Sequence, residues 1–250
     1  AKAEIFLVNG AECEPMLRTD QQLAVKSPEL LVRGLELAMQ ATGAKEGIIA
    51  LKAKYGEAIA ALKPLLAPNM RIEILRDIYP AGDEVITLWL TTGRRVPPGG
   101  IPIDVGAVVN NPQTLINVAR AAAGEPVTTR TFTITGAVAK PMTITAAIGT
   151  SLRELLDFAG GPTCNAPAFI DGGPMMGHLI DDLNRPVTKT TGGLIVLPDD
   201  HMLIVRKRQT MQTVLRIAKT VCEQCLYCTE LCPRHIIGHE LPPHLIIRTV

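Results

Sequence analysis

Four cysteines near the C-terminal end of the sequence have a spacing that suits metal ligation. They lie in the run Cys222-Glu-Gln-Cys225-Leu-Tyr-Cys228-Thr-Glu-Leu-Cys232-Pro, which has the form C-x2-C-x2-C-x3-C-P. In such a run three thiolates can reach three corners of one iron–sulfur cubane, and the proline turns the chain away after the fourth cysteine. We therefore predict a [4Fe–4S] site with Cys222, Cys225, Cys228 and Cys232 as ligands.

Two alternatives to this interpretation concern the metal and the number of clusters. Structural zinc sites usually place two close cysteine pairs a dozen or more residues apart, and this run is more compact. In two-cluster proteins the fourth cysteine of the run belongs to the other cluster. Either all four cysteines hold one cluster, or Cys232 needs partners that the printed sequence does not contain. Because the sequence also begins without Met, we expect it to be a piece of a longer protein.

Polar motifs follow three segments that have the apolar pattern of strands. The motifs are Asn9-Gly-Ala-Glu12-Cys-Glu14-Pro, Tyr79-Pro-Ala-Gly-Asp83-Glu84 and Asn110-Asn111. In open α/β sheets, ligands bind at the carboxyl ends of the strands, so the three motifs could converge on one crevice. Each motif taken alone is also compatible with ordinary turn chemistry, and Asn111 followed by proline suits a helix N-cap.

The elements that must position these motifs alternate in type along residues 1–125. Strand-like segments at 5–8, 47–52, 71–75 and 105–109 are separated by helix-like segments, of which the clearest are 28–42, 55–66 and 113–123. Residues 85–90 fit a helix or a strand equally well. The alternation predicts a first domain built on a parallel sheet with helices on its faces.

The pattern changes after Gly124-Glu-Pro126. Thr, Val and Ile alternate over 131–136 and 142–145, Ser151 and Glu154 form a capping box for a helix over 151–159, and 194–197 is another apolar strand. This predicts a small α+β domain over residues 126–200. A helical pattern over 210–221 leads into the cysteines, so residues 201–250 are expected to be mostly helical.

Composition excludes several other classes of protein. The 250 residues carry a formal net charge of +1 and 3% aromatic residues, which argues against a nucleic-acid surface. The apolar stretches are too short for a membrane span, and the first residues do not form a signal peptide. Four clustered thiols without a secretory signal indicate a reducing compartment, so we expect a cytoplasmic protein.

The motifs quoted above, with Gly99-Gly-Ile-Pro and Val109-Asn-Asn-Pro-Gln-Thr-Leu-Ile-Asn117, resemble the flavin-domain motifs of one superfamily. It includes the flavin subunit of respiratory complex I, the Rnf complex C subunit and the cobalamin reductases of propanediol utilisation. Residues 131–161 resemble its soluble-ligand-binding β-grasp (SLBB) domain, and 222–233 resemble its ferredoxin run. The form of residues 79–84 and the absence of membrane signals are most similar to the cobalamin reductase branch.

This resemblance implies a Rossmann-like α/β flavin domain, a β-grasp domain and a helical, ferredoxin-like iron–sulfur segment. By motif match the residues that would contact FMN are Asn9, Glu12, Asp83, Glu84, Asn110 and Asn111. Glu14 would face the nicotinamide nucleotide. One family contact is absent, because Ala11 stands where complex I has Asp. The glycine-rich loop that cradles the flavin phosphate lies before Asn9 in the family, so we expect the chain as printed to bind FMN weakly or not at all.

The resemblance further implies an NADH-dependent oxidoreductase that passes electrons through FMN to [4Fe–4S] clusters and reduces cobalamin for adenosylation. A corrinoid adenosyltransferase and the shell proteins of a bacterial microcompartment would be its partners. One alternative is an Rnf-type subunit on an ion-pumping membrane complex. Another is a non-catalytic module that binds a corrinoid or another small ligand and holds a structural metal.

Overall fold

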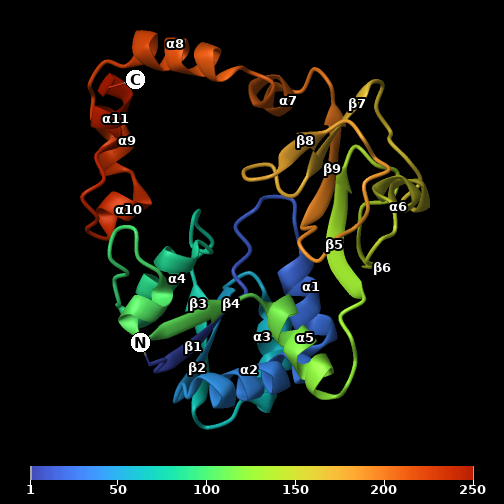
Figure 1. Ribbon diagram of the computed structural model, residues 1–250, viewed down its shortest axis with the longest axis vertical. Helices are drawn as coiled ribbons and strands as arrows, with labels where there is room; N and C mark the ends of the chain where they lie inside the picture. Colours follow the sequence, from blue (N-terminus) through green and yellow to red (C-terminus); the bar gives the residue numbers. More distant parts are fainter. Residues whose placement is uncertain (1, 250) are drawn as a thin grey trace.

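The computed structural model describes residues 2–249, and a parallel four-stranded sheet organises the first half of the chain (Figure 1). Its strands are β1 (Ile5–Asn9), β2 (Glu46–Lys52), β3 (Met70–Leu75) and β4 (Ala107–Asn110), in the spatial order β3-β2-β1-β4. The chain runs outward from β1 to β3 and then returns to place β4 on the other side of β1. The boundary between β1 and β4 is therefore the point at which the strand order reverses, where α/β folds bind ligands.

Helices cover both faces of this sheet. On one face lie α1 (Thr19–Lys26), α2 (Pro28–Thr42), α3 (Gly56–Leu62) and α5 (Pro112–Ala122), whose apolar residues share a core with Phe6 and Val8 of β1. On the other face α4 (Glu84–Thr92) packs against Ile5 and Leu7. Successive β1 side chains thus serve opposite cores, as the pleat of a strand requires.

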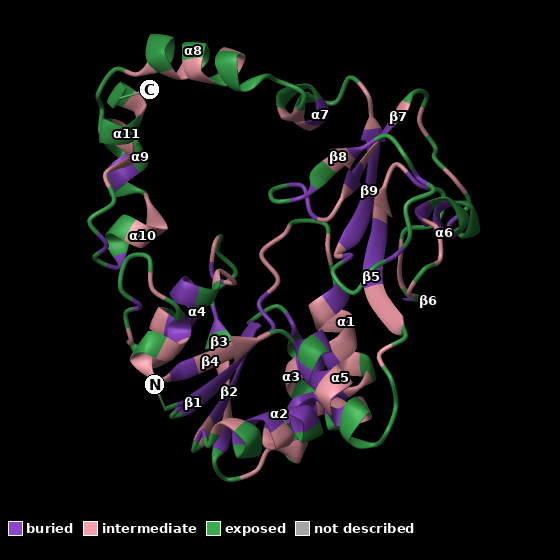
Figure 2. Cartoon of the chain, viewed as in Figure 1, coloured by how far each residue is buried: buried purple, intermediate pink, exposed green. Residues whose placement is uncertain are grey.

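The second half contains a mixed five-stranded sheet. Its strands are β5 (Thr129–Gly136), β6 (Met142–Ala147), β7 (Pro167–Asp171), β8 (His178–Ile180) and β9 (Gly193–Pro198), in the order β6-β5-β9-β7-β8. The helix α6 (Leu152–Phe158) packs on it, around the fully buried Phe132. Figure 2 shows the central strands β1, β2 and β9 mostly in the buried colour.

The last part of the chain is a series of short helices that curves back to the first sheet (Figure 1). They are α7 (Met202–Lys207), α8 (Met211–Val221), α9 (Tyr227–Glu230), α10 (Pro233–Ile236) and α11 (Pro243–Thr249). None of the residues of α8 is buried, whereas Ile237, just after α10, joins the core beneath α4. Within residues 2–249 no helix combines the length and apolar character that crossing a bilayer requires.

The structure corrects or completes several expected elements. Residues 85–90, which the sequence left undecided, are helical in α4. The helix expected over 55–66 ends as an α-helix at Leu62 and continues as a 3-10 turn, Lys63–Leu65, because Pro64 interrupts its hydrogen bonding. The strand expected from 105 begins at Ala107, since Pro102–Val105 is another 3-10 turn ended by Gly106 at φ 76°. Helix α1 was not predicted.

Candidate functional site

Asn9 and Asn110 end the two strands that flank the reversal point of the sheet. Val8 is the register partner of Asn110, so the two asparagines lie at the same carboxyl edge. The Asn9 Nδ2 donates to the carbonyl oxygen of Gly82 at 2.7 Å. The half-buried Asn110 makes no side-chain hydrogen bond with the part of the chain that the structure describes. Its amide is therefore available to a ligand.

The loop between β3 and α4 is tied to the loop after β1. A Cβ on Gly82 would overlap the carbonyl oxygen of Ala11, so only glycine allows this approach. The Gly82 N–H donates to the Cys13 Sγ at 2.8 Å. Asp83 is the N-cap of α4, and its Oδ1 accepts from the N–H groups of Val85 and Ile86 at 3.1 Å each. Glu84, in the first turn, is exposed.

Glu12 and Asp20 form a pair of interacting carboxyl groups beneath the β1 loop. Loss of water contact raises the pKa of Glu12, and the charge of Glu14 adds to this effect. Desolvation, followed by the charge of Glu12, raises the pKa of Asp20 to about 8, while Arg130 opposes the shift. At neutral pH this pair therefore favours holding a proton.

Glu14 reaches the second domain. Its Oε2 accepts from the N–H of Met175 at 2.8 Å, and its Oε1 accepts from the N–H of Met176 at 2.7 Å. The same loop, residues 171–177, is held from the other side by Lys207, whose Nζ donates to the carbonyl oxygen of Gly177 at 2.6 Å. Both carboxylate oxygens of Glu14 thus have backbone donors, and its expected role towards a nucleotide stays a prediction.

Two cavities flank these carboxylates. One, of ≈ 610 Å³, lies at the ends of β2 and β3 and includes Lys52, Tyr55 and Asp77. The other, of ≈ 400 Å³, is lined by residues of both domains, among them Asn111 and Arg130. Glu12 and Glu14 border both cavities, whereas Asn9, Asp83, Glu84 and Asn110 border neither.

Sequence reasoning did not identify Lys52, Asp77, Asp20 or Arg130 as part of this region. Lys52 ends an otherwise apolar strand, its side chain is only 8% exposed, and its Nζ lies 3.2 Å from Asp77 Oδ1. A lysine at the carboxyl end of a buried strand was the available signal. The other three residues carry no comparable pattern.

The N-terminus of α5 presents a second polar feature at the edge of the sheet. The Asn111 Oδ1 accepts from the Thr114 N–H at 3.0 Å and from the Thr114 hydroxyl at 2.8 Å, which confirms the expected N-cap. Among the described residues, the buried Oε1 of Gln113 has no hydrogen-bond partner. A helix start of this kind suits an anion, and Gln113 could accept from a hydroxyl group.

The four cysteines of the run are free thiols on the segment between α8 and α10. Cys222 follows α8 and Cys232 precedes α10, while Cys225 and Cys228 are exposed. Nowhere between residues 2 and 249 do three or more His, Cys, Asp or Glu side chains gather at metal-binding geometry. The thiols are accessible and chemically suited to iron or zinc, but they are not assembled around a common point.

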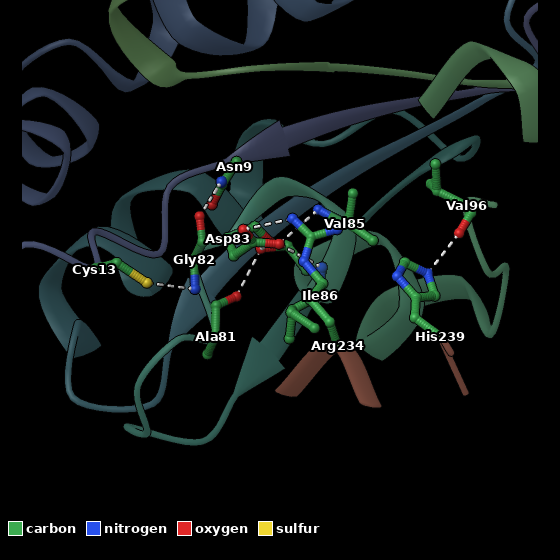
Figure 3. Close-up of polar contacts among 11 residues, drawn as sticks. Asn9, Cys13, Ala81, Gly82, Asp83, Val85, Ile86, Val96, Arg234 and His239 are labelled. Atoms are coloured by element: carbon green, nitrogen blue, oxygen red, sulfur yellow. Dashed lines mark hydrogen bonds and ion pairs between the residues drawn. The ribbon is translucent and has the colours of Figure 1, made fainter. Parts of the chain in front are cut away.

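The turn after the cysteines docks on the first domain next to the predicted flavin residues (Figure 3). Arg234 Nη2 donates to Asp83 Oδ2 at 2.9 Å. His239 Nε2 lies 2.8 Å from the carbonyl oxygen of Val96, in a buried contact. The fold therefore brings the turn after the cysteine run to the motif of residues 79–84.

Family models match two segments of the chain. Residues 1–120 match the Nuo51 FMN-binding domain, and residues 131–179 match the SLBB domain. The NAD+-reducing [NiFe]-hydrogenase, in a crystal structure of its H2-reduced state, contains a chain with a similar backbone. The TM-score is 0.67 at 25% sequence identity, over 94% of this chain and 46% of that chain.

Curated relatives match all or nearly all of the chain. It is 62% identical over its full length to cobalamin reductase PduS of Salmonella typhimurium (strain LT2), of which it covers 56%. It is 32% identical to the C subunit of the proton-translocating ferredoxin:NAD(+) oxidoreductase complex of Clostridium ljungdahlii, over 94% of this chain and 50% of that protein. The chain thus spans about half the length of the curated relatives it matches. Over most or all of its length the chain is therefore similar to the PduS cobalamin reductases and to these C subunits, with a segment that matches the Nuo51 FMN-binding domain followed by one that matches the SLBB domain.

Proposed function

We propose that this chain belongs to an NADH-dependent oxidoreductase that passes electrons through FMN to [4Fe–4S] clusters and reduces cobalamin. The observation that carries the proposal is the convergence of the motifs containing Asn9, Asp83 and Asn110 at one edge of the sheet, where the turn that follows the cysteine run also docks. The 62% identity to a protein named cobalamin reductase PduS supports cobalamin as the final acceptor. A corrinoid adenosyltransferase and the shell of a bacterial microcompartment are the partners we propose, and they rest on the resemblance alone.

The residues present fit FMN. The free amide of Asn110 and the unpartnered Gln113 Oε1 suit the hydroxyl groups of a ribityl chain. We retain Asn111, whose Oδ1 also caps α5, as another FMN contact. We retain Asn9, Glu12, Asp83 and Glu84 as the remaining FMN contacts, and Glu14 as a residue that would face the nicotinamide nucleotide.

The mechanism assigns distinct roles to the groups of this chain. Bound FMN would supply the change from two-electron hydride transfer to one-electron transfer. Asn9 holds the loop of Gly82 in place, and Asn110 orients the ligand. The raised pKa of Glu12 suits it to hold a proton near the site, and Lys52 places a positive charge beside it. The thiols of Cys222, Cys225 and Cys228 would hold a cluster, with Cys232 completing it or serving a second one.

We also retain three functional units as part of this proposal. Residues 1–125 would bind FMN and NADH, residues 126–200 would form the β-grasp unit, and residues 201–250 would form a ferredoxin-like iron–sulfur unit. The two sheets, over residues 5–110 and 129–198, support the first division. The return of α10 to the first domain supports a role of the third unit in electron transfer.

The first test is the cofactor content of the chain purified without oxygen. Iron, zinc and acid-labile sulfide are measured together with the flavin released on denaturation. About four iron and four sulfide per chain would support the cluster. Zinc without iron or sulfide would overturn the redox proposal and favour a binding module with a structural metal.

A second candidate function is that of an Rnf-type C subunit. The observation that favours it is the 34% identity to the C subunit of the Na(+)-translocating ferredoxin:NAD(+) oxidoreductase complex of Acetobacterium woodii. The two functions differ in the acceptor. NADH-dependent reduction of cob(III)alamin without ion movement supports the first, and activity that requires membrane partners and moves ions supports the second.

A further inference from the structure

The turn that follows the cysteines, residues 233–239, docks on the first domain. Helix α10 begins directly after Cys232, and the Cys232 carbonyl oxygen accepts from the Ile236 N–H at 2.9 Å. Arg234, two residues beyond Cys232, binds Asp83, which lies 151 positions earlier in the sequence (Figure 3). The position of Arg234 is thus rigidly linked to the last cysteine through one helical turn.

Apolar and buried contacts anchor this turn independently of Arg234. Ile237 is 6% exposed and packs in the core that contains Val85 and Leu88. His239 is 7% exposed and contacts the Val96 carbonyl oxygen, and Arg95 Nη1 donates to the Gly238 carbonyl oxygen at 3.2 Å. Because burial of apolar surface stabilises a dock of this kind, the turn should stay bound when Arg234 is replaced.

The contribution of Arg234 is directional. The side chains of Arg234 and Asp83 are 33% and 32% exposed, so water and salt screen their attraction. The planar guanidinium nevertheless fixes the direction from which it meets a carboxylate. Asp83 is itself immobilised, because its other oxygen caps α4. The pair therefore defines an orientation and adds little stability.

A short series of bonds joins this pair to the edge of the sheet. Asp83 directly follows Gly82, whose carbonyl oxygen accepts from Asn9 at the end of β1. We propose that Arg234 is a positioning residue that sets the orientation of the cysteine segment, residues 222–232, relative to the predicted flavin residues. The nature of the electron carriers rests on the proposed function, but the docking contact does not.

The first experiment uses hydrogen exchange of the metal-free, flavin-free chain. Arg234→Gln is compared with Arg234→Lys and with Arg216→Gln, which removes an exposed arginine of α8. Arg234→Gln should speed exchange of the amides of residues 234–239 by about two- to fivefold, as expected for loss of a partly screened ion pair. Arg234→Lys should restore part of the protection, and Arg216→Gln should change nothing. Unchanged exchange, or faster exchange throughout β1 and β2 as well, would overturn the proposal.

The second experiment follows electron transfer in the chain with reconstituted clusters and FMN added in excess, because weak FMN binding is expected. Reduction of flavin by NADH should proceed at the wild-type rate in Arg234→Gln, whereas the following reduction of the clusters should slow, with Arg234→Lys in between. Equal slowing of both steps would show that Arg234 acts on the flavin site itself and would overturn the positioning role. If NADH reduces the flavin in the wild-type protein but the clusters are never reduced, the proposed function fails. The hydrogen-exchange experiment then still tests whether Arg234 holds the turn on the first domain.

Discussion

At the scale of single residues, the carboxyl groups around the β1 loop have unequal surroundings. Glu14 receives two backbone hydrogen bonds, whereas Glu12 and Asp20 lose water contact and repel each other. The sequence identified Glu12 and Glu14 by motif. It gave no sign of Asp20, because that residue comes from α1, which lacks a clear helical pattern.

Asp20 should make the stability of the chain depend on pH. Its pKa is raised to about 8 in the folded state, so the folded state keeps a proton that the unfolded state releases near pH 4. Stability should therefore be fully present below pH 4 and fall as pH rises towards 8. Asp20→Asn should remove this loss of stability at high pH. Its free energy of unfolding at pH 8 should exceed that of the wild type by at least about 1 kcal/mol, because one pKa unit corresponds to about 1.4 kcal/mol. Urea unfolding at pH 5 and pH 8 measures the difference.

The control for Asp20 is Asp157→Asn, which changes an exposed carboxylate of α6. It should leave the pH dependence of unfolding as in the wild type. Curves for Asp20→Asn that stay parallel to wild type from pH 5 to pH 8 would show that Asp20 titrates normally.

Gly173 should be essential for the contact between Glu14 and the second domain. A Cβ at this position would overlap the Glu14 carboxylate, so Gly173→Ala must displace it from the Met175 and Met176 amides. Loss of these bonds should cost about 1–3 kcal/mol of unfolding free energy. Glu14→Ala combined with Gly173→Ala should be no worse than Glu14→Ala alone, because truncation of Glu14 already removes the contact and the overlap.

Urea unfolding of Gly173→Ala is compared with that of Gly56→Ala. Gly56 begins α3, and an added Cβ there meets nothing within 4 Å. If the two variants are equally stable, Glu14 does not depend on the glycine.

At the scale of elements, the crossing of α2 and α5 places the start of α5 at the edge of the sheet. Gly34 makes the crossing possible, because a Cβ there would overlap the backbone of Leu115. The sequence predicted both helices and the Asn111 cap from local patterns. The sequence did not reveal that α5 contacts α2 at Gly34, because nothing in the residues around a glycine in a helix indicates which other helix packs against it.

Gly34→Ala should move α5 and weaken the first domain. Overpacking of this kind costs about 1–3 kcal/mol, even though alanine favours helix formation. Gln40→Ala, on the exposed side of the same helix, should be neutral or stabilising. Thermal unfolding of the two variants compares the effects, and the idea fails if Gly34→Ala matches or exceeds wild-type stability.

At the scale of the whole molecule, the chain leaves the second domain through α7 and α8 and returns to the first domain at α10 (Figure 1). The cysteine run lies on this return path, and its thiols are not gathered. Metal binding to such a segment is coupled to its folding, because ligands must be brought together and deprotonated. Cluster binding should therefore order residues 222–232 further.

Single Cys→Ser changes should separate the roles of the six cysteines. Serine at Cys222, Cys225 or Cys228 should abolish iron and sulfide binding, since each supplies a cluster ligand. Cys13→Ser and Cys164→Ser should leave the iron and sulfide content unchanged. If one cluster uses all four thiols, Cys232→Ser should disrupt that cluster. If Cys232 instead belongs to a second cluster, the cluster held by the other three cysteines should stay intact. Iron and sulfide analysis measures each variant, and wild-type content in Cys225→Ser would contradict the assignment.

Local sequence patterns were enough to predict the strands that lead into Asn9 and Asn110 and the helix caps at Asn111 and Ser151. The spacing of the cysteines was likewise enough to predict a metal site. These features depend on residues a few positions apart, where periodicity and turn chemistry act directly. The folded chain alone reveals that Glu14 binds the amides of residues 175 and 176 and that Arg234 binds Asp83. These partners lie more than 150 positions apart in the sequence, and they meet because the second domain and the final helices dock on the first through surfaces that no local pattern describes.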